Sequence, residues 1–169
     1  MTATANFKIA LIGANGMLAT AIKKHAPDDC LILAYDLPKF DITARDQVFL
    51  LQQDAPDIII NCAAYTNVDG CESHSDLAMR VNGDGPGFLA ELALKIDATL
   101  VHISTDFIFD GSKESSYQED DLPQPLSVYG KSKLAGEQQI QQSGLEKYFI
   151  VRTSWLYGAG GNNFVETMI

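Results

Sequence analysis

The chain has 169 residues, 46% of them hydrophobic and 20% charged, which predicts one globular domain and argues against disorder. Lys and Arg together number 12 against 22 Asp and Glu, and the formal net charge of -10, without a local basic stripe, argues against nucleic acid as a partner. The first residues form neither a signal peptide nor a membrane span, so we expect a cytoplasmic protein with no membrane partner.

Short apolar runs alternate with segments of helical spacing along the chain. The apolar runs at residues 7–12, 31–35, 58–60, 100–104 and 148–152 predict buried strands. The segments between them predict a helix after Gly16, a helix from an N-cap at Thr43 to before Pro56, a helical stretch at about 76–95 interrupted around residues 83–87, and a helix at 127–142. This alternation predicts an α/β fold, a Rossmann-like doubly wound parallel sheet with helices on both faces.

The turn after the first predicted strand carries a candidate phosphate-binding loop. Residues 13–19 read Gly-Ala-Asn-Gly-Met-Leu-Ala, which fits the spacing G-x-x-G-x-x-[G/A] between a strand and a helix. Such a loop turns sharply and brings the first amides of the helix against a pyrophosphate. The candidate residues are Gly13, Asn15, Gly16, Met17 and Leu18, and the alternative is an ordinary glycine-rich turn.

Asp36 ends the second predicted strand, about 20 residues beyond this loop, where a carboxylate accepts hydrogen bonds from an adenosine ribose. That position favours NADH. Lys39 follows closely and could meet a 2′-phosphate instead, while Asp41 and Ile42 could lie beside the adenine, so the choice between NADPH and NADH stays open. The alternative for Asp36 is a cap for the turn before Pro38.

Tyr129 and Lys133 are four residues apart in a predicted helix, so both side chains project from one face. A phenol is a poor acid or base at neutral pH, but a neighbouring ammonium and the cationic nicotinamide of an oxidised cofactor lower its pKa. Tyr129 can then exchange a proton with a carbonyl oxygen as hydride is transferred, and Lys133 would hold the nicotinamide ribose. Thr105, at the end of the fourth strand, is expected to hydrogen-bond the same oxygen, with Ser104 as the alternative.

Further stretches extend these motifs. They are residues 61–69 (Asn-Cys-Ala-Ala-Tyr-Thr-Asn-Val-Asp), Val81-Asn82, residues 104–111 (Ser-Thr-Asp-Phe-Ile-Phe-Asp-Gly), residues 129–133 (Tyr-Gly-Lys-Ser-Lys) and residues 152–158 (Arg-Thr-Ser-Trp-Leu-Tyr-Gly). With these motifs in this order, the chain resembles the extended short-chain dehydrogenase/reductases that act on nucleotide sugars. Among them it most resembles the dTDP-4-dehydrorhamnose reductases, over essentially its whole length.

The resemblance implies reduction of the C4 ketone of dTDP-4-dehydro-L-rhamnose to dTDP-L-rhamnose, with NADPH or NADH as cofactor and the nucleotide sugar as partner molecule. It implies Thr105, Tyr129 and Lys133 as the catalytic residues. Further cofactor contacts are expected from Ala63, Ala64, Tyr65 and Asn82, and substrate contacts from Thr105, Asp106, Phe107, Trp155 and Asn163.

The chain also departs from this family. Phe107 stands where a tyrosine is often found, and Ala21 stands where some members have an acidic residue that binds Mg²⁺ at a dimer interface, so we predict no metal. Family members are longer than this chain. We therefore expect residues 1–169 to form the cofactor-binding domain, with 153–169 the start of the substrate-binding region and most of the C-terminal substrate domain missing. A homodimer is compatible with the resemblance.

Two other functions remain open from the sequence. A nucleotide-sugar 4-epimerase or 4,6-dehydratase shares the fold, although a dehydratase usually has Asp-Glu after the strand-end threonine, where this chain has Asp106-Phe107. A non-catalytic NADP-binding regulatory subunit, like that of methionine adenosyltransferase, is the second. His102, inside the fourth strand, is expected to be a satisfied core residue rather than a ligand or a base.

Overall fold

The computed structural model describes residues 7–158, and these form a parallel sheet of five strands in the order β2-β1-β3-β4-β5. The strands are β1 (Phe7–Ile12), β2 (Cys30–Tyr35), β3 (Ile58–Asn61), β4 (Thr99–Thr105) and β5 (Tyr148–Thr153). The helices are α1 (Met17–His25), α2 (Arg45–Leu50), α3 (Val68–Ser73), α4 (Ser75–Ala78), α5 (Gly85–Ile96) and α6 (Val128–Gln142). The predicted α/β fold with a doubly wound parallel sheet is confirmed.

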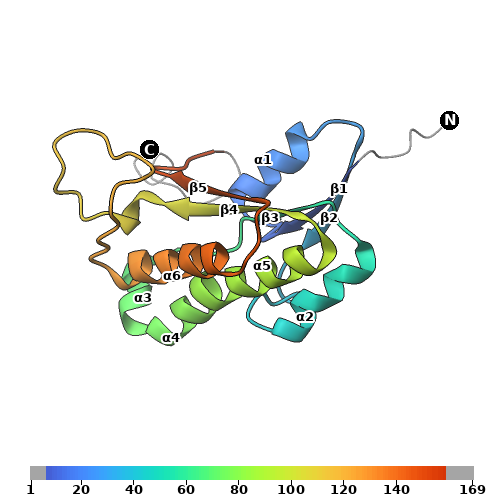
Figure 1. The fold of residues 1–169 in the computed structure, drawn as a ribbon, viewed down its shortest axis with the longest axis horizontal. Helices are drawn as coiled ribbons and strands as arrows, with labels where there is room; N and C mark the ends of the chain where they lie inside the picture. Colours follow the sequence, from blue (N-terminus) through green and yellow to red (C-terminus); the bar gives the residue numbers. More distant parts are fainter. Residues whose placement is uncertain (1–6, 159–169) are drawn as a thin grey trace.

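The helices cover the two faces of the sheet unequally. In Figure 1, α1 lies against one face, and α2, α5 and α6 lie along the other. None of the helices in residues 7–158 combines the length and the apolar character that crossing a lipid bilayer requires.

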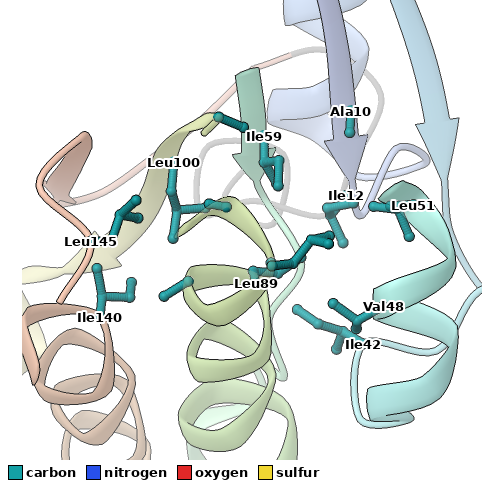
Figure 2. Packing of buried hydrophobic residues seen from close by; sticks show 14 of the residues in the cluster. Ala10, Ile12, Ile42, Val48, Leu51, Ile59, Leu89, Leu100, Ile140 and Leu145 are labelled. Atoms are coloured by element: carbon teal, nitrogen blue, oxygen red, sulfur yellow. The ribbon is translucent and has the colours of Figure 1, made fainter. Parts of the chain in front are cut away.

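The main core lies between the sheet and the helices of the second face. In Figure 2, Leu89 of α5 lies below the strands on the side of Ile12, and Ile140 of α6 lies on the side of Leu100. Apolar side chains that are removed from water on both sides in this way stabilise a fold by about 25 cal/mol for each Å² that they bury. This packing explains why the strands read as almost uninterrupted apolar runs.

The strand order reverses at β1, because the chain passes from β1 to β2 on one side and from β2 to β3 on the other. Outside the carboxyl ends of β1 and β3, the connections therefore leave in opposite directions. In doubly wound sheets, ligands bind in the crevice at such a reversal. The loop that leads from β4 to α6 extends beyond the ends of β4 and β5 at the same edge (Figure 1).

The predicted N-cap at Thr43 is wrong. The helix α2 begins at Arg45 with Ala44 in the cap position. The amide and the hydroxyl of Thr43 both donate hydrogen bonds to Oδ1 of Asp41, at 2.9 and 2.8 Å. Asp41 thus forms a local side-chain turn, which competes with helix capping.

The predicted interruption around residues 83–87 is also wrong, because α4, a π-helical segment (Met79–Asp84) and α5 follow one another directly. Glycine is present here for close packing: a Cβ on Gly85 would lie 2.8 Å from Ile42, and one on Gly87 would lie 2.1 Å from Gln139. Pro86 stands in the first turn of α5, directly after the π-helical segment. The short α3 was not predicted.

Candidate functional site

Two adjoining cavities follow the carboxyl edge of the sheet. The larger, of about 590 Å³, lies against the first turn of α1, the ends of β4 and β5, and the start of α6. The smaller, of about 300 Å³, lies between the ends of β1 and β3 and residues 36–42. Gly16, Cys62 and Ala64 line both cavities, so the two form one trough across the point where the strand order reverses.

The turn from β1 to α1 requires glycine at position 13. Gly13 has φ +73°, and a Cβ on it would lie 2.6 Å from the backbone nitrogen of Ala63. A side chain at this position would therefore be strained and would also strike the chain that leaves β3. The amides of Gly13 and Ala14 donate to the carbonyl of Tyr35, at 2.9 and 3.2 Å, which fixes the turn against β2.

The amino end of α1 opens into the larger cavity, which Met17 and Leu18 line. Gly16 is the cap residue and has no side chain that could cap the helix, and the first turn carries no acidic residue. The basic residues Lys23, Lys24 and His25 lie in the last turn instead. The partial positive charge of a helix amino end favours an anion, so this turn suits a phosphate group.

Asp36 lines the smaller cavity together with Asp41, Ile42 and Ala63. Its carboxylate accepts hydrogen bonds from the backbone amides of Asn15 and Leu37, each at 2.7 Å. It therefore joins the β1–α1 turn to the loop after β2. Asn15 and Lys39 lie around Asp36 as well, but they line a further cavity of about 830 Å³ between β2 and α2, which adjoins the smaller one at Asp36, Leu37 and Phe40.

Thr105, Tyr129 and Lys133, which come from β4 and α6, all line the larger cavity. The start of α6 lies close to the residues that follow β4. A Cβ on Gly130 would lie only 2.2 Å from the carbonyl oxygen of Phe107, so only glycine permits this approach. Ser127 caps this helix by accepting a hydrogen bond from the amide of Gly130 at 3.1 Å. The predicted hydroxyl, phenol and amine are thus brought to one cavity.

Tyr129 is a weaker acid than the sequence suggested. Burial raises the pKa of its phenol, a hydrogen bond with Thr105 lowers it, and Cys71 and Asp106 raise it, with a net increase. The expected decrease through Lys133 is not present in the chain alone. Nζ of Lys133 instead donates a hydrogen bond to the carbonyl of Ile103 at 2.7 Å.

Lys133 is itself almost entirely buried, with 2% of its surface exposed. Burial lowers the pKa of its ammonium to about 8, against the influence of Glu137 and Cys62, which raise it. Besides the Ile103 carbonyl, Nζ lies 3.4 Å from Nε2 of His102. His102 is fully buried in β4, which confirms the prediction of a satisfied core residue.

A buried ion pair holds the next turn of α6. Glu137 is 1% exposed, and Arg152 of β5 donates to its carboxylate through Nη2 at 2.8 Å and through Nε at 3.2 Å. The hydroxyl of Ser104 on β4 donates to the same carboxylate. Arg152 also reaches the carbonyl of Glu119 at 3.1 Å. Ser104 is therefore engaged inside the sheet, and this favours Thr105 over Ser104 as the hydroxyl that faces the cavity.

Three predicted cofactor residues, Asn15, Tyr65 and Asn82, line neither cavity of the trough as the structure describes it. The side chain of Asn82 accepts from the amide of Tyr65 at 2.8 Å and donates to the carbonyl of Tyr65 at 3.1 Å and to Oγ of Ser132 at 3.0 Å. Asn82 thus ties the loop after β3 to α6. The buried amide of Asn82 therefore has a structural role in joining these two segments, and the sequence pattern did not predict it.

The predicted substrate residues Asp106, Phe107 and Trp155 all line the larger cavity. The ring of Phe107 meets that of Tyr129 edge to face, with 5.6 Å between the ring centres. Trp155 is exposed and has φ +53°. Asn163 lies outside the described residues. Within residues 7–158, no group of three His, Cys, Asp or Glu side chains is arranged to hold a metal ion.

Comparison with known proteins places these features in a family. The model described as the RmlD substrate binding domain matches residues 7–169. The chain belongs to this family. A dTDP-4-dehydrorhamnose reductase of Sinorhizobium fredii is 44% identical over 163 residues, and one of Aggregatibacter actinomycetemcomitans is 42% identical over 165 residues. Each alignment covers 96% of this chain but 55% and 56% of the relative, so this RmlD-family chain spans about half the length of the curated relatives it matches.

Solved structures agree with this placement. The dTDP-4-dehydrorhamnose reductase of Bacillus anthracis, in complex with NADP, superposes with a TM-score of 0.93 at 43% identity, covering 96% of the RmlD-family chain and 58% of the other. That of Clostridium acetobutylicum gives 0.91 at 44% identity, covering 95% and 57%. A UDP-glucose 4-epimerase of Brucella ovis, at 17% identity and a TM-score of 0.76 over 86% of this chain and 51% of the other, shares the fold alone.

Proposed function

We propose that this chain is the cofactor-binding part of an NADPH- or NADH-dependent reductase that converts dTDP-4-dehydro-L-rhamnose to dTDP-L-rhamnose. The observation that carries the proposal is the larger cavity, in which Thr105, Tyr129 and Lys133 face the first turn of α1. The names of the relatives and the NADP in the Bacillus anthracis structure support the cofactor and the reaction.

The trough suits a dinucleotide by its shape and by its charge. Gly13 leaves no side chain between β1 and β3, and the amino end of α1 offers positive potential to a pyrophosphate. Asp36, Asp41 and Ile42 would then surround the adenosine. A ribose hydroxyl can donate to the free lone pairs of Asp36, whereas a 2′-phosphate would need the positive charge of Lys39.

The reaction needs a hydride, a proton and a site for the ketone oxygen. When bound, a reduced nicotinamide supplies the hydride to C4 of the sugar. Tyr129 donates its phenolic proton to the C4 oxygen, and the raised pKa of the phenol keeps that proton available in the direction of reduction. Thr105 donates a hydrogen bond to the same oxygen. Lys133 holds the cofactor ribose from the floor of the cavity.

The remaining predictions concern the rest of the protein. We propose that residues 153–169 begin the substrate-binding region, since Thr153, Trp155 and Leu156 already line the larger cavity. Asp106 and Phe107 would contact the sugar from the end of β4. A homodimer and a cytoplasmic location stay predictions.

The reaction is tested in a chimera in which this chain replaces the aligned part of the Sinorhizobium fredii relative. Oxidation of NADPH is followed spectroscopically with dTDP-4-dehydro-L-rhamnose as the substrate. The Tyr129→Phe chimera keeps the ring but loses the proton donor. We expect kcat to fall by roughly 10²- to 10⁴-fold, the usual contribution of a general acid, while NADPH binding is retained. An equal kcat in the two chimeras would contradict the role of Tyr129.

A further inference from the structure

A carboxylate joins the two segments that leave β4 and β5. Thr105 and Thr153 are the last register partners of these strands, so the next residues, Asp106 and Ser154, lie beside each other. The hydroxyl of Ser154 donates a hydrogen bond to Oδ2 of Asp106 at 2.8 Å. Because the sheet already holds the two backbones together, this bond requires little further loss of conformational entropy.

The other carboxylate oxygen of Asp106 is held by Thr105. The hydroxyl of Thr105 accepts a hydrogen bond from the amide of Phe107 at 3.2 Å and donates one to Oδ1 of Asp106 at 3.2 Å. Asp106 is also the first residue of a short 3-10 helical turn (Asp106–Ile108), which fixes its backbone. With its backbone and Oδ1 held in this way, Asp106 presents Oδ2 to Ser154.

The residue after Ser154 has a strained backbone. Trp155 has φ +53°, a conformation that a bulky residue rarely adopts and that persists only where neighbouring contacts determine it. Its segment is fixed on both sides: Ser154 is bound by Asp106, and Gly158 lies against α1, since a Cβ on it would be 3.6 Å from Met17. Trp155, between these two points, lines the larger cavity.

In addition to its proposed contact with the sugar, we propose that Asp106 is a positioning residue, which fixes the turn at Trp155 through the hydroxyl of Ser154 and so keeps the indole at the larger cavity. The indole is 72% exposed, so the conformation of its backbone largely determines where the ring lies. A single carboxylate thereby connects the predicted catalytic residue Thr105 with the predicted substrate residue Trp155.

The inference deepens the proposed function, and only its consequence for the reaction rests on that function. A hydroxyl has one hydrogen, so Thr105 cannot donate to Asp106 and to a ketone oxygen at the same time. When the ketone accepts this hydrogen bond, Ser154 still holds Asp106 through Oδ2. Trp155 therefore stays at the cavity while Thr105 turns its proton to the substrate.

The first experiment uses the fluorescence of the chain itself. Trp155 is its only tryptophan, so time-resolved anisotropy measures the nanosecond motion of this indole without cofactor or substrate. Ser154→Ala removes the donor, and Ser154→Thr retains a hydroxyl. We expect a larger amplitude of fast depolarisation in Ser154→Ala, and in Ser154→Thr the amplitude of the unmodified chain. An unchanged amplitude in Ser154→Ala would overturn the proposal.

The second experiment removes the acceptor. Asp106→Ala is compared with Asp120→Ala, a matched control in the same connection between β4 and α6 that lines neither cavity of the trough. Asp106, Asp120 and Ser154 are all exposed, so no variant removes a core side chain. We expect Asp106→Ala to increase the fast amplitude as Ser154→Ala does, and Asp120→Ala to leave it unchanged. Equal amplitudes in Asp106→Ala and Asp120→Ala would show that Asp106 does not hold Trp155.

The double variant Asp106→Ala, Ser154→Ala tests whether the two residues act through one contact. We expect its fast amplitude to equal that of either single variant, because both substitutions remove the same hydrogen bond. Additive increases would mean that Asp106 and Ser154 act on Trp155 independently, which contradicts the proposal.

The consequence for the reaction is measured in the chimera with the Sinorhizobium fredii relative. Ser154→Ala should raise KM for dTDP-4-dehydro-L-rhamnose by roughly 3- to 10-fold, the range that the net contribution of one hydrogen bond gives, and should change kcat much less. A lower kcat with an unchanged KM would contradict a role through Trp155. An inactive chimera, together with the expected anisotropies, would contradict the proposed function and support the positioning of Trp155.

Discussion

Single buried polar residues set the chemistry of this cavity. His102 lies in the middle of the sheet, where burial and the nearby Lys133 hold the pKa of its imidazole well below the ordinary value of 6.5. The residue is therefore neutral in the folded chain at pH values at which the unfolded chain binds a proton. Every such difference in protonation makes the free energy of unfolding depend on pH.

We predict that the chain loses stability as the pH falls below about 6.5, because the unfolded state then binds one more proton than the folded state. The free energy of unfolding should decrease with a slope of up to about 1.4 kcal/mol for each pH unit between about pH 6.5 and pH 5. Urea unfolding at a series of pH values measures this slope. In His102→Asn, which cannot titrate, the slope should flatten, and an unchanged slope would contradict the assignment.

The residues that carry a local motif were predictable from the sequence. Gly13, Thr105, Tyr129 and Lys133 stand at spacings whose chemistry is known, and the structure brings them to one trough. The contact of Asn61 with His102, 3.1 Å between Nδ2 and Nδ1, was not predictable. It depends on which residues of β3 and β4 are register partners, and the sequence of one strand does not contain that information.

At the scale of elements, the position of α6 decides whether Tyr129 and Lys133 reach the cavity. This helix is fixed at its start by the contact of Gly130 with Phe107 and one turn after Lys133 by Glu137. Glu137 binds β5 through Arg152 and β4 through Ser104. The pair is enclosed, since the side chains of Arg152 and Glu137 are 21% and 1% exposed.

We predict that Glu137→Gln lowers the free energy of unfolding by about 3 kcal/mol, because it leaves the Arg152 guanidinium largely buried without its counter-charge. This value is the lower end of the usual range, since Arg152 keeps some contact with solvent. Asp97→Asn makes the same chemical change in the exposed pair with Lys147 and should leave stability nearly unchanged. Urea unfolding compares the two variants. Equal losses would show that the buried pair does not fix α6.

The errors in the predicted helices are explained by contacts that single helices and loops make with their neighbours. Thr43 was predicted to cap α2, but Asp41 engages its hydroxyl first. The glycines around residue 85 were predicted to interrupt a helix, but they allow α5 to pack against Ile42 and α6. A side chain two residues away overrides the expected cap, and packing against Ile42 and α6 overrides the expected break.

At the scale of the whole molecule, the reversal of strand order at β1 places every motif at one edge of the sheet. The phosphate loop follows β1, Asp36 follows β2, Thr105 ends β4, and α6 brings Tyr129 and Lys133 across. The fold class was predictable because five apolar runs separated by helices permit few arrangements. The extent of the substrate region was not, since the chain spans about half the length of its curated relatives.

The most direct test of this account is calorimetric titration of the chain with NADPH and NADH, in parallel with the variants Gly13→Ala and Gly111→Ala. Both glycines have a positive φ, +73° and +74°, but an added Cβ would lie 2.6 Å from Ala63 at position 13 and has nothing within 4 Å at position 111. We predict saturable binding of at least one dinucleotide to the chain and to Gly111→Ala, and its loss in Gly13→Ala. Absence of binding to the folded chain, or equal binding by the two variants, would contradict the claim that this trough holds the cofactor.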